Sequence, residues 1–400
     1  MDDPLNFCPE EFAGVKEALE NNDQAAAAAK IQQYLEKQDK IPLNIGITGE
    51  SGAGKSTFIN AFRGVDNRDE QAAPTGTVET TMQITKYPHP NYPNVFFWDL
   101  PGIGTTNFPA DEYLKRVEFE KFDFFIIISD TRFREHDVKL AQEIQKMEKK
   151  FYFVRSKIDN DVRAEERSQR DFSLERSLAK IKEYCIDGLE KGGIKSSKVF
   201  LVSSFDLHIY DFSCLHKTLE EELPAHKRNV LLFSMPSINM EIINKKKEAF
   251  QHQIKWYSVG SAALAGVSIP GIPAVDLMIM VKAVKSYIAG FGLHESSLRR
   301  LSSTTGVPYD ELCAVLQSPL AAKEMEKITT DLIQKLLITA ASRATSRALE
   351  MSRFIPLFGI PVTMSLSFTT TCSALSLFLN MLADDAQRVF EKALGLNTSV

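Results

Sequence analysis

The segment from Gly49 to Ser56 constrains this chain more than any other part of its sequence. It reads GESGAGKS, which fits the pattern GxxxxGK followed by Ser or Thr, and it lies between an apolar run, LNIGIT (43–48), and a helical pattern from Thr57 to Arg63. Glycines in a turn between a strand and a helix let backbone N–H groups surround a phosphate, and the helix N-terminus adds partial positive charge. The sequence therefore predicts a phosphate-binding loop.

Two side chains of this loop have expected tasks. Lys55 is expected to reach the β- and γ-phosphates of a nucleotide. The Ser56 hydroxyl is expected to bind Mg²⁺, because magnesium prefers a few protein oxygens together with phosphate oxygens.

Short apolar runs rich in Ile, Val and Phe predict the sheet that supports the loop. They comprise residues 43–48, 95–100, 122–129, 151–156 and 198–203. Long helical patterns separate the last four, and strands that alternate with helices indicate a mostly parallel sheet covered on both faces. The sequence predicts one α/β domain over residues 41–224.

The rest of the chain is expected to be helical. Residues 1–40 hold two short helical patterns, Glu11–Glu20 and Gln24–Gln38. Residues 225–400 show no comparable strand run and alternate amphipathic patterns with uncharged stretches. We expect an N-terminal helical segment and a C-terminal helical domain on either side of the α/β domain.

Two uncharged stretches, 256–275 and 354–383, reach the length of a membrane-spanning helix. One interpretation is insertion into a membrane as a hairpin with Pro-Gly at the bend. We favour burial in a large helical core, because prolines divide both stretches and their polar content is high. A third possibility is the basic edge of a helix expected from Asp331 to Arg353, which suits either an anionic membrane surface or the wet side of a core-facing helix.

Two further motifs follow predicted strands. Asp99-Leu-Pro-Gly102 ends the run 95–100 and fits DxxG, which would place Asp99 near Mg²⁺ through water and the Gly102 N–H at the γ-phosphate. Ser156-Lys157-Ile158-Asp159 follows the run 151–156 and is a degenerate NKxD or TKxD motif, with Ser in the first position.

Asp159 carries the argument for guanine. A carboxylate only accepts hydrogen bonds, so Asp159 can accept two from the N1–H and amino group of guanine, whereas adenine offers no matching pair of donors. Lys157 would cover the base with its alkyl stem, and Ser203 and Ser204 after the last run would supply backbone contacts to the guanine oxygen. The order of these motifs predicts GTP rather than ATP.

Composition excludes several alternatives. The chain holds 47 Lys and Arg against 52 Asp and Glu, a net charge of -5, which argues against nucleic acid as a partner. The five cysteines form no CxxC pair, so neither a disulfide framework nor a zinc cluster is indicated. The opening MDDPLNFCPEEF lacks the features of a secretory signal and has no Gly after Met1, so neither export nor myristoylation is expected.

The segments GESGAGKSTFINAFRGV, TGTVETTM, VFFWDLPGIGTTNFP, FDFFIIIS and FYFVRSKID together resemble those of the immunity-related GTPases, the interferon-inducible family of the dynamin-like group. The resemblance is close over residues 41–224 and looser in the flanking helices. It implies a Ras-like G domain with a mostly parallel sheet, packed on an all-helical domain built from the N- and C-terminal segments.

The resemblance also implies roles for particular residues. Thr75 and Thr81 match the switch I threonines, and Glu79 matches a position implicated at a dimer interface across the nucleotide. The set implied in catalysis is Lys55, Ser56, Glu79, Thr81 and Gly102, and the set implied at Mg²⁺ is Ser56, Thr81 and Asp99. The set implied in GTP or GDP binding is Gly52, Ala53, Gly54, Lys55, Ser56, Thr57, Thr75, Gly76, Lys157, Asp159, Ser203 and Ser204.

The resemblance implies a cytoplasmic GTPase that assembles through its G domain in the GTP state, alone or with related GTPases. It further implies peripheral action at intracellular membranes in cell-autonomous immunity. Small GTPases orient the attacking water with a Gln after the DxxG glycine, but this chain has Ile103 there, so slow turnover is expected in the monomer. The alternatives are a GTP-dependent binding module with negligible hydrolysis and a membrane-inserted structural protein with a vestigial G domain.

Overall fold

The computed structural model describes most of the chain. The described residues are 14–15, 17–18, 21, 23–76, 84–100, 118–130, 135–194, 198–265, 273–321, 327–341 and 362–395. They divide into two compact units, one of residues 41–239 and one that joins residues 1–40 with residues 240–400.

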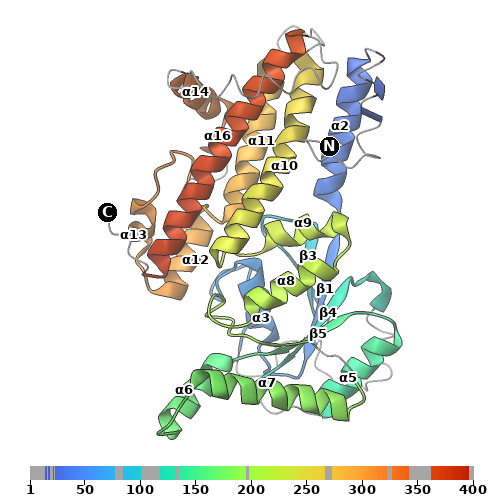
Figure 1. The fold of residues 1–400 in the computed structure, drawn as a ribbon, viewed down its shortest axis with the longest axis vertical. Helices are drawn as coiled ribbons and strands as arrows, with labels where there is room; N and C mark the ends of the chain where they lie inside the picture. Colours follow the sequence, from blue (N-terminus) through green and yellow to red (C-terminus); the bar gives the residue numbers. More distant parts are fainter. Residues whose placement is uncertain are drawn as a thin grey trace. The chain divides into compact units, whose positions relative to one another are not determined.

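The first unit is built on a six-stranded sheet with the strand order β2-β3-β1-β4-β5-β6 (Figure 1). All neighbouring strands are parallel except β2, which pairs with β3 in the antiparallel sense. This confirms the mostly parallel sheet. The strands are β1 (Leu43–Gly49), β2 (Thr85–Pro88), β3 (Val95–Asp99), β4 (Phe124–Ser129), β5 (Phe151–Arg155) and β6 (Val199–Leu201).

The sequence analysis missed β2. This strand has four residues at the edge of the sheet, carries Lys86 and ends at Pro88, so it lacks the apolar run that identified the others. The remaining strands coincide with the five predicted runs.

Helices cover both faces of the sheet. On one face, Ile144 of α5 and Leu189 of α7 pack in a core cluster with Phe125 and Phe153. On the other face, the Phe62 ring of α3 lies 5.0 Å from the Phe97 ring of β3. The helices of this unit are α3 (Lys55–Arg63), α5 (Glu135–Lys146), α6 (Ile158–Ser168), α7 (Leu174–Lys191), α8 (Phe212–Glu222), α9 (Ala225–Ser234) and the 3-10 turn η1 (Phe119–Lys121).

The compact unit extends beyond residue 224, where we expected the α/β domain to end, to Asn239. The reason is that α9 packs against β1 and β3. Asn239 also donates from its Nδ2 to the Ser213 Oγ of α8 at 2.8 Å. The segment after α8 therefore contributes to the layer that covers the sheet.

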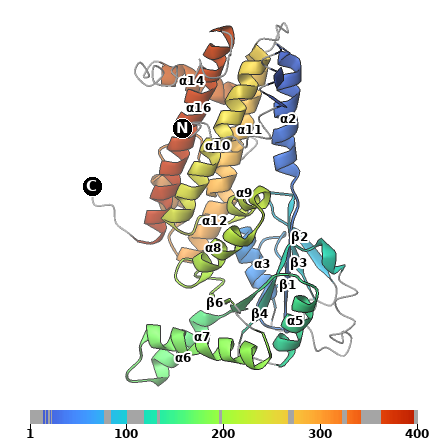
Figure 2. The ribbon, with the colours of Figure 1, turned by 45° about the vertical axis from the view of Figure 1, so that its right-hand side comes forward.

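The described elements of the second unit are all helices. The central helix α10 packs against both α2 and α16 (Figure 2). The rings of Tyr34 and Trp256 stack with their centroids 4.1 Å apart. The helices are α2 (Gln24–Lys40), α10 (Met240–Ala265), α11 (Pro273–Phe291), α12 (Glu295–Thr305), α13 (Tyr309–Ala314), α14 (Thr330–Ala341) and α16 (Val362–Ala393). The helix predicted over 11–20 lies largely outside the described residues.

The uncharged stretches are only partly described, because residues 266–272 and 354–361 lie outside. Trp256 and Val259 of the first and Phe378 and Leu382 of the second are buried. Among the described residues, no helix is long and apolar enough to cross a membrane. Of the predicted basic helix, α14 is described to Ala341, and the remainder to Arg353 lies outside.

Candidate nucleotide site

The carboxyl ends of the parallel strands bring the predicted site residues to one edge of the sheet, where ligands bind in sheets of this kind. Predicted residues lie at or directly after the ends of β1, β3, β5 and β6. The phosphate loop follows β1, Asp99 ends β3, Ser156 to Asp159 follow β5, and Ser203 and Ser204 follow β6. A residue that was not predicted, Asp130, follows β4.

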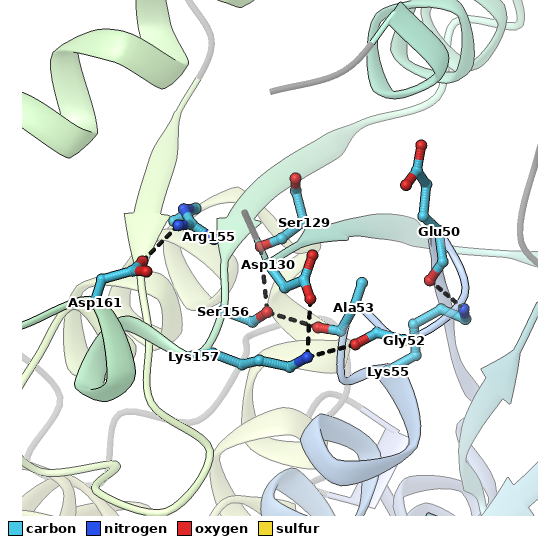
Figure 3. Close-up of polar contacts among 10 residues, drawn as sticks. All are labelled: Glu50, Gly52, Ala53, Lys55, Ser129, Asp130, Arg155, Ser156, Lys157 and Asp161. Atoms are coloured by element: carbon cyan, nitrogen blue, oxygen red, sulfur yellow. Dashed lines mark hydrogen bonds and ion pairs between the residues drawn. The ribbon is translucent and has the colours of Figure 1, made fainter. Parts of the chain in front are cut away.

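The phosphate loop has a backbone that only glycine permits at its start. Gly49 has φ 135°, and a Cβ there would lie 2.0 Å from the carbonyl oxygen of Ile128. Lys55 is buried, and its Nζ donates to the carbonyl oxygen of Gly49 at 3.1 Å. The same Nζ donates to the carbonyl oxygen of Glu50 at 2.9 Å (Figure 3). The loop is thereby curled around the ammonium group that is expected to meet the phosphates.

Ser56 and Asp99 form the expected oxygen pair. The Ser56 Oγ donates to Asp99 Oδ2 at 2.9 Å, and Asp99 is buried at the end of β3. A hydroxyl and a carboxylate beside the phosphate loop are hard oxygen ligands, which suit Mg²⁺. The residues present therefore fit this metal.

The guanine motif is tied directly to the phosphate loop. Lys157 has a left-handed backbone, with φ 54°, and its Nζ donates to the Gly52 carbonyl at 2.6 Å and to Asp130 Oδ2 at 2.8 Å. The Ser156 Oγ donates to the Ala53 carbonyl at 2.6 Å (Figure 3). Serine in the first position of the motif thus forms the link between the two loops.

Sequence analysis missed Asp130. Its signal is similar to that of Asp99, an acidic residue at the carboxyl end of an apolar strand, here directly after β4. Asp130 forms an ion pair with Lys157, a partner 27 residues further along the chain. Local spacing does not reveal such a pair.

An ion pair connects the strand that precedes the guanine motif to the helix that begins within it. Arg155, buried at the end of β5, donates from Nη2 to Asp161 Oδ2 at 2.5 Å in the first turn of α6 (Figure 3). Burial raises the pKa of Asp161, and the Arg155 guanidinium opposes that rise. The pair brackets Ser156 and Lys157 and holds the strand end to the helix start.

The loop after β6 lies beside the guanine motif. The buried Ser203 accepts at its Oγ from the backbone N–H groups of Phe205 and Asp206, both at 3.2 Å. Burial raises the pKa of Tyr210, and the negative charges of Asp159 and Asp206 raise it further. The Ser203 hydroxyl is used in hydrogen bonds within its own loop. We therefore expect the backbone groups of this loop, and not this side chain, to contact guanine.

Several predicted residues are not part of this arrangement. Thr75 and Gly76 are described and exposed. The residues expected at the γ-phosphate, at Mg²⁺ or at the dimer interface lie outside the described residues, as does the residue in the position of the small-GTPase Gln. They are Glu79, Thr81, Gly102 and Ile103.

The fold and the site together define an α/β protein with a phosphate-binding loop (P-loop) and a guanine-recognition motif. A family model described as interferon-inducible GTPase (IIGP) matches residues 8–393. The chain belongs to the interferon-inducible GTPase family.

The similarity to individual relatives extends over nearly the whole chain. Interferon-inducible GTPase 5 of Rattus norvegicus is 39% identical over 388 residues, which cover 96% of this chain and 83% of that protein. Interferon-gamma-inducible GTPase 10 of Mus musculus is 35% identical over 394 residues, 98% of this chain and 91% of that protein. A solved structure of a GDP·AlF4⁻-bound Aquifex aeolicus Era variant covers 45% of this chain and 56% of Era, with a TM-score of 0.33 and 21% sequence identity.

Proposed function

We propose that this protein binds GTP and GDP with Mg²⁺ and hydrolyses GTP to GDP and phosphate. The observation that carries the proposal is the direct connection between the phosphate loop and the guanine motif, through Ser156 to Ala53 and Lys157 to Gly52. These contacts fix the distance between the site for phosphates and the site for the base. A guanine nucleotide is the ligand whose two ends match both motifs.

The contacts between the two motifs support the following binding roles. The loop from Gly52 to Thr57 surrounds the phosphates, and Lys55 neutralises their charge as hydrolysis proceeds. Asp159 accepts the guanine N1–H and amino group. Lys157 covers the base, with its ammonium held by Asp130.

Ser56 and Asp99 are the residues that would hold Mg²⁺. When bound, the metal supplies positive charge to the β- and γ-phosphate oxygens.

Hydrolysis needs a group that orients the attacking water. Ile103 stands where small GTPases have Gln, and an aliphatic side chain has no atom that bonds to water. We therefore propose slow turnover in the monomer and faster turnover when two copies associate across the nucleotide, with Glu79 at that interface. Family membership and the resemblance support this proposal.

Family membership and the resemblance also support a proposal about the cellular role. We propose that the GTP-bound protein assembles through its G domain, with itself or with related GTPases. The assembly acts at the surface of intracellular membranes in cell-autonomous innate immunity.

The site assignment is tested by nucleotide binding. Lys55→Ala is expected to abolish binding of GTP and GDP, because the buried ammonium is lost from the phosphate loop. Fluorescence titration with labelled GTP, GDP and ATP measures it, and Lys217→Ala, an exposed lysine on α8, is the matched control. Wild-type GTP affinity in folded Lys55→Ala protein would refute the site.

The assignment of Asp159 to the guanine base is tested by a substitution at that residue. Asp159→Asn replaces an oxygen that accepts by an amide that donates, so the affinity for GDP is expected to fall at least about tenfold, one mismatched hydrogen bond being worth ~1–3 kcal/mol. Xanthosine diphosphate offers a carbonyl where guanine has its amino group, and its affinity is expected to rise. Equal loss of both nucleotides, with Asp171→Asn as the exposed control, would contradict the assignment.

A second candidate function is a GTP-dependent binding module with negligible hydrolysis. The absence of a Gln at residue 103 favours it. It predicts tight GTP binding with no turnover at any protein concentration.

A further inference from the structure

The turn from β5 into α6 carries the guanine motif, and no side chain caps the helix that it begins. β5 ends at Arg155 and α6 begins at Ile158, so two residues make the turn. Lys157, at the N-cap position, has φ 54°, a left-handed backbone that residues with a side chain rarely adopt. Such a backbone persists only where surrounding contacts hold it.

The ion pair of Arg155 with Asp161 closes this turn. The backbone of Arg155 is fixed in the sheet, where it pairs with Leu201 and its carbonyl accepts from the Val202 N–H at 2.8 Å. Its guanidinium Nη2 donates to Asp161 Oδ2 at 2.5 Å, in the first turn of α6. The pair therefore joins a fixed strand end to the start of the helix.

Asp161 balances a buried positive charge. Arg155 is 6% exposed, and within the described part of the chain its buried Nη1 has no hydrogen-bond partner. A buried charge that loses its partner is costly, so a guanidinium with one nitrogen unpaired depends on the carboxylate that it contacts. We therefore expect this pair to resist rotation of α6 about its axis.

Helix geometry relates this contact to the direction of Asp159. Residues two apart in an α-helix differ in direction by about 200°, so Asp159 and Asp161 project from opposite sides of the first turn of α6. Figure 3 shows Arg155 and Asp161 on the side of Lys157 that lies away from Gly52 of the phosphate loop. Holding Asp161 on that side directs Asp159 toward the other.

We propose that Arg155 and Asp161 are positioning residues that set the direction of the Asp159 carboxylate and thereby the preference of the site for guanine. The proposal rests on the proposed function. Without the pair, α6 can rotate and Asp159 loses its alignment with the base. The phosphate loop precedes α3 and does not include the pair, so its loss should weaken recognition of the base more than recognition of the phosphates.

Inosine diphosphate (IDP) separates these two effects, because it has the phosphates of GDP but lacks the amino group that Asp159 is proposed to accept. The variant is Asp161→Ala, and its matched control is Glu166→Ala, at an exposed acidic residue of the same helix. Isothermal titration with GDP and IDP measures base recognition. Hydrogen exchange of the nucleotide-free protein measures the turn, at the Asn160 N–H that donates to the Lys157 carbonyl at 3.0 Å.

The wild-type protein is expected to prefer GDP over IDP at least about tenfold, as one hydrogen bond to a charged acceptor provides. In Asp161→Ala this preference should fall to about threefold or less, and exchange at the Asn160 amide should rise at least about tenfold. Glu166→Ala should keep both wild-type values. Equal losses of affinity for GDP and IDP, with the preference intact, would mean that the pair acts on stability alone and would overturn the proposal.

The double variant Arg155→Met/Asp161→Ala keeps the test decisive where Asp161→Ala fails to fold. It removes both charges, and replacing a buried ion pair by apolar side chains is often neutral for stability. The double variant is expected to unfold near the wild-type urea concentration and still to lose the preference for GDP over IDP. A double variant that kept the wild-type preference would count against the proposal.

Failure of the proposed function has a different signature. A wild-type protein that bound neither GDP nor IDP would refute the proposed function. The exchange measurement on the nucleotide-free protein would still decide whether Asp161 holds the turn.

Discussion

Ser156 shows how one substitution in a motif is accommodated. A serine hydroxyl has a single proton to donate, and the shorter of its two contacts is to the Ala53 carbonyl, at 2.6 Å against 3.2 Å to the Ser129 carbonyl. The buried hydroxyl therefore links β5 to the phosphate loop although it is shorter than an Asn side chain. With serine in its first position, the guanine motif is therefore connected to the phosphate loop.

Ser156→Ala is expected to raise the dissociation constant for GDP roughly tenfold, because a buried carbonyl loses its donor at a cost of ~1–3 kcal/mol. Isothermal titration of GDP measures the change. Ser168→Ala is the control, since it removes an exposed serine-to-carbonyl hydrogen bond at the end of α6. Unchanged GDP affinity in Ser156→Ala would show that the link does not organise the site.

Residue-level prediction of the site rested on local signals. Lys55, Ser56 and Asp159 stand in short motifs directly after predicted strands, so the spacing identified them. Asp161 and Asp130 act through partners 6 and 27 residues away, at Arg155 and Lys157. Only the turn from β5 into α6 and the order of the strands bring those groups together, and a linear pattern does not contain that information.

At the scale of elements, the buried runs identified β1 and β3 to β6, because strands covered on both faces are continuously apolar. The edge strand β2 has an alternating, half-exposed pattern and ends in proline, so its pairing with β3 determines it rather than its composition. The sequence of α9 likewise did not predict that this helix packs on β1 and β3.

Helix α10 carries an unusual contact with α11. Lys246 is fully buried, and its Nζ donates to the Gly290 carbonyl at 2.5 Å. That carbonyl is among the last of α11, where helix carbonyls have no partner within the helix. Burial lowers the pKa of Lys246 to about 7.

This contact predicts a pH dependence of stability. The unfolded chain keeps the Lys246 proton up to about pH 10, whereas the folded protein releases it near pH 7, so raising the pH between these values favours folding. From about pH 7 to 8.5 the Lys246 contribution to the free energy of unfolding is expected to rise by ~1–2 kcal/mol. Urea unfolding of wild type and Lys246→Met measures it as a difference that grows with pH.

Lys247→Met, a change at the next position of α10, is the control and should follow wild type at both pH values. A difference between wild type and Lys246→Met that stayed constant over this range would mean that Lys246 does not titrate in the folded protein.

At the scale of the whole molecule, one unit carries the nucleotide site and the other is formed from both ends of the chain. Helical periodicity predicted the helices of the second unit but not the packing of α2 against α10, which joins segments about two hundred residues apart in sequence. The resemblance to a family supplied that expectation. The α/β class and the motif residues could therefore be predicted from the sequence alone. The residues that contact the motifs could be identified only from the fold.

The central claim is that this chain hydrolyses GTP and does so faster when copies associate. The most direct test measures GTP turnover per molecule over a range of protein concentrations, together with light scattering, with Lys55→Ala and GDP as controls. We predict that turnover per molecule rises with concentration as scattering rises. Turnover that stays flat and near zero despite tight GTP binding would contradict the claim and identify a nucleotide-dependent binding module instead.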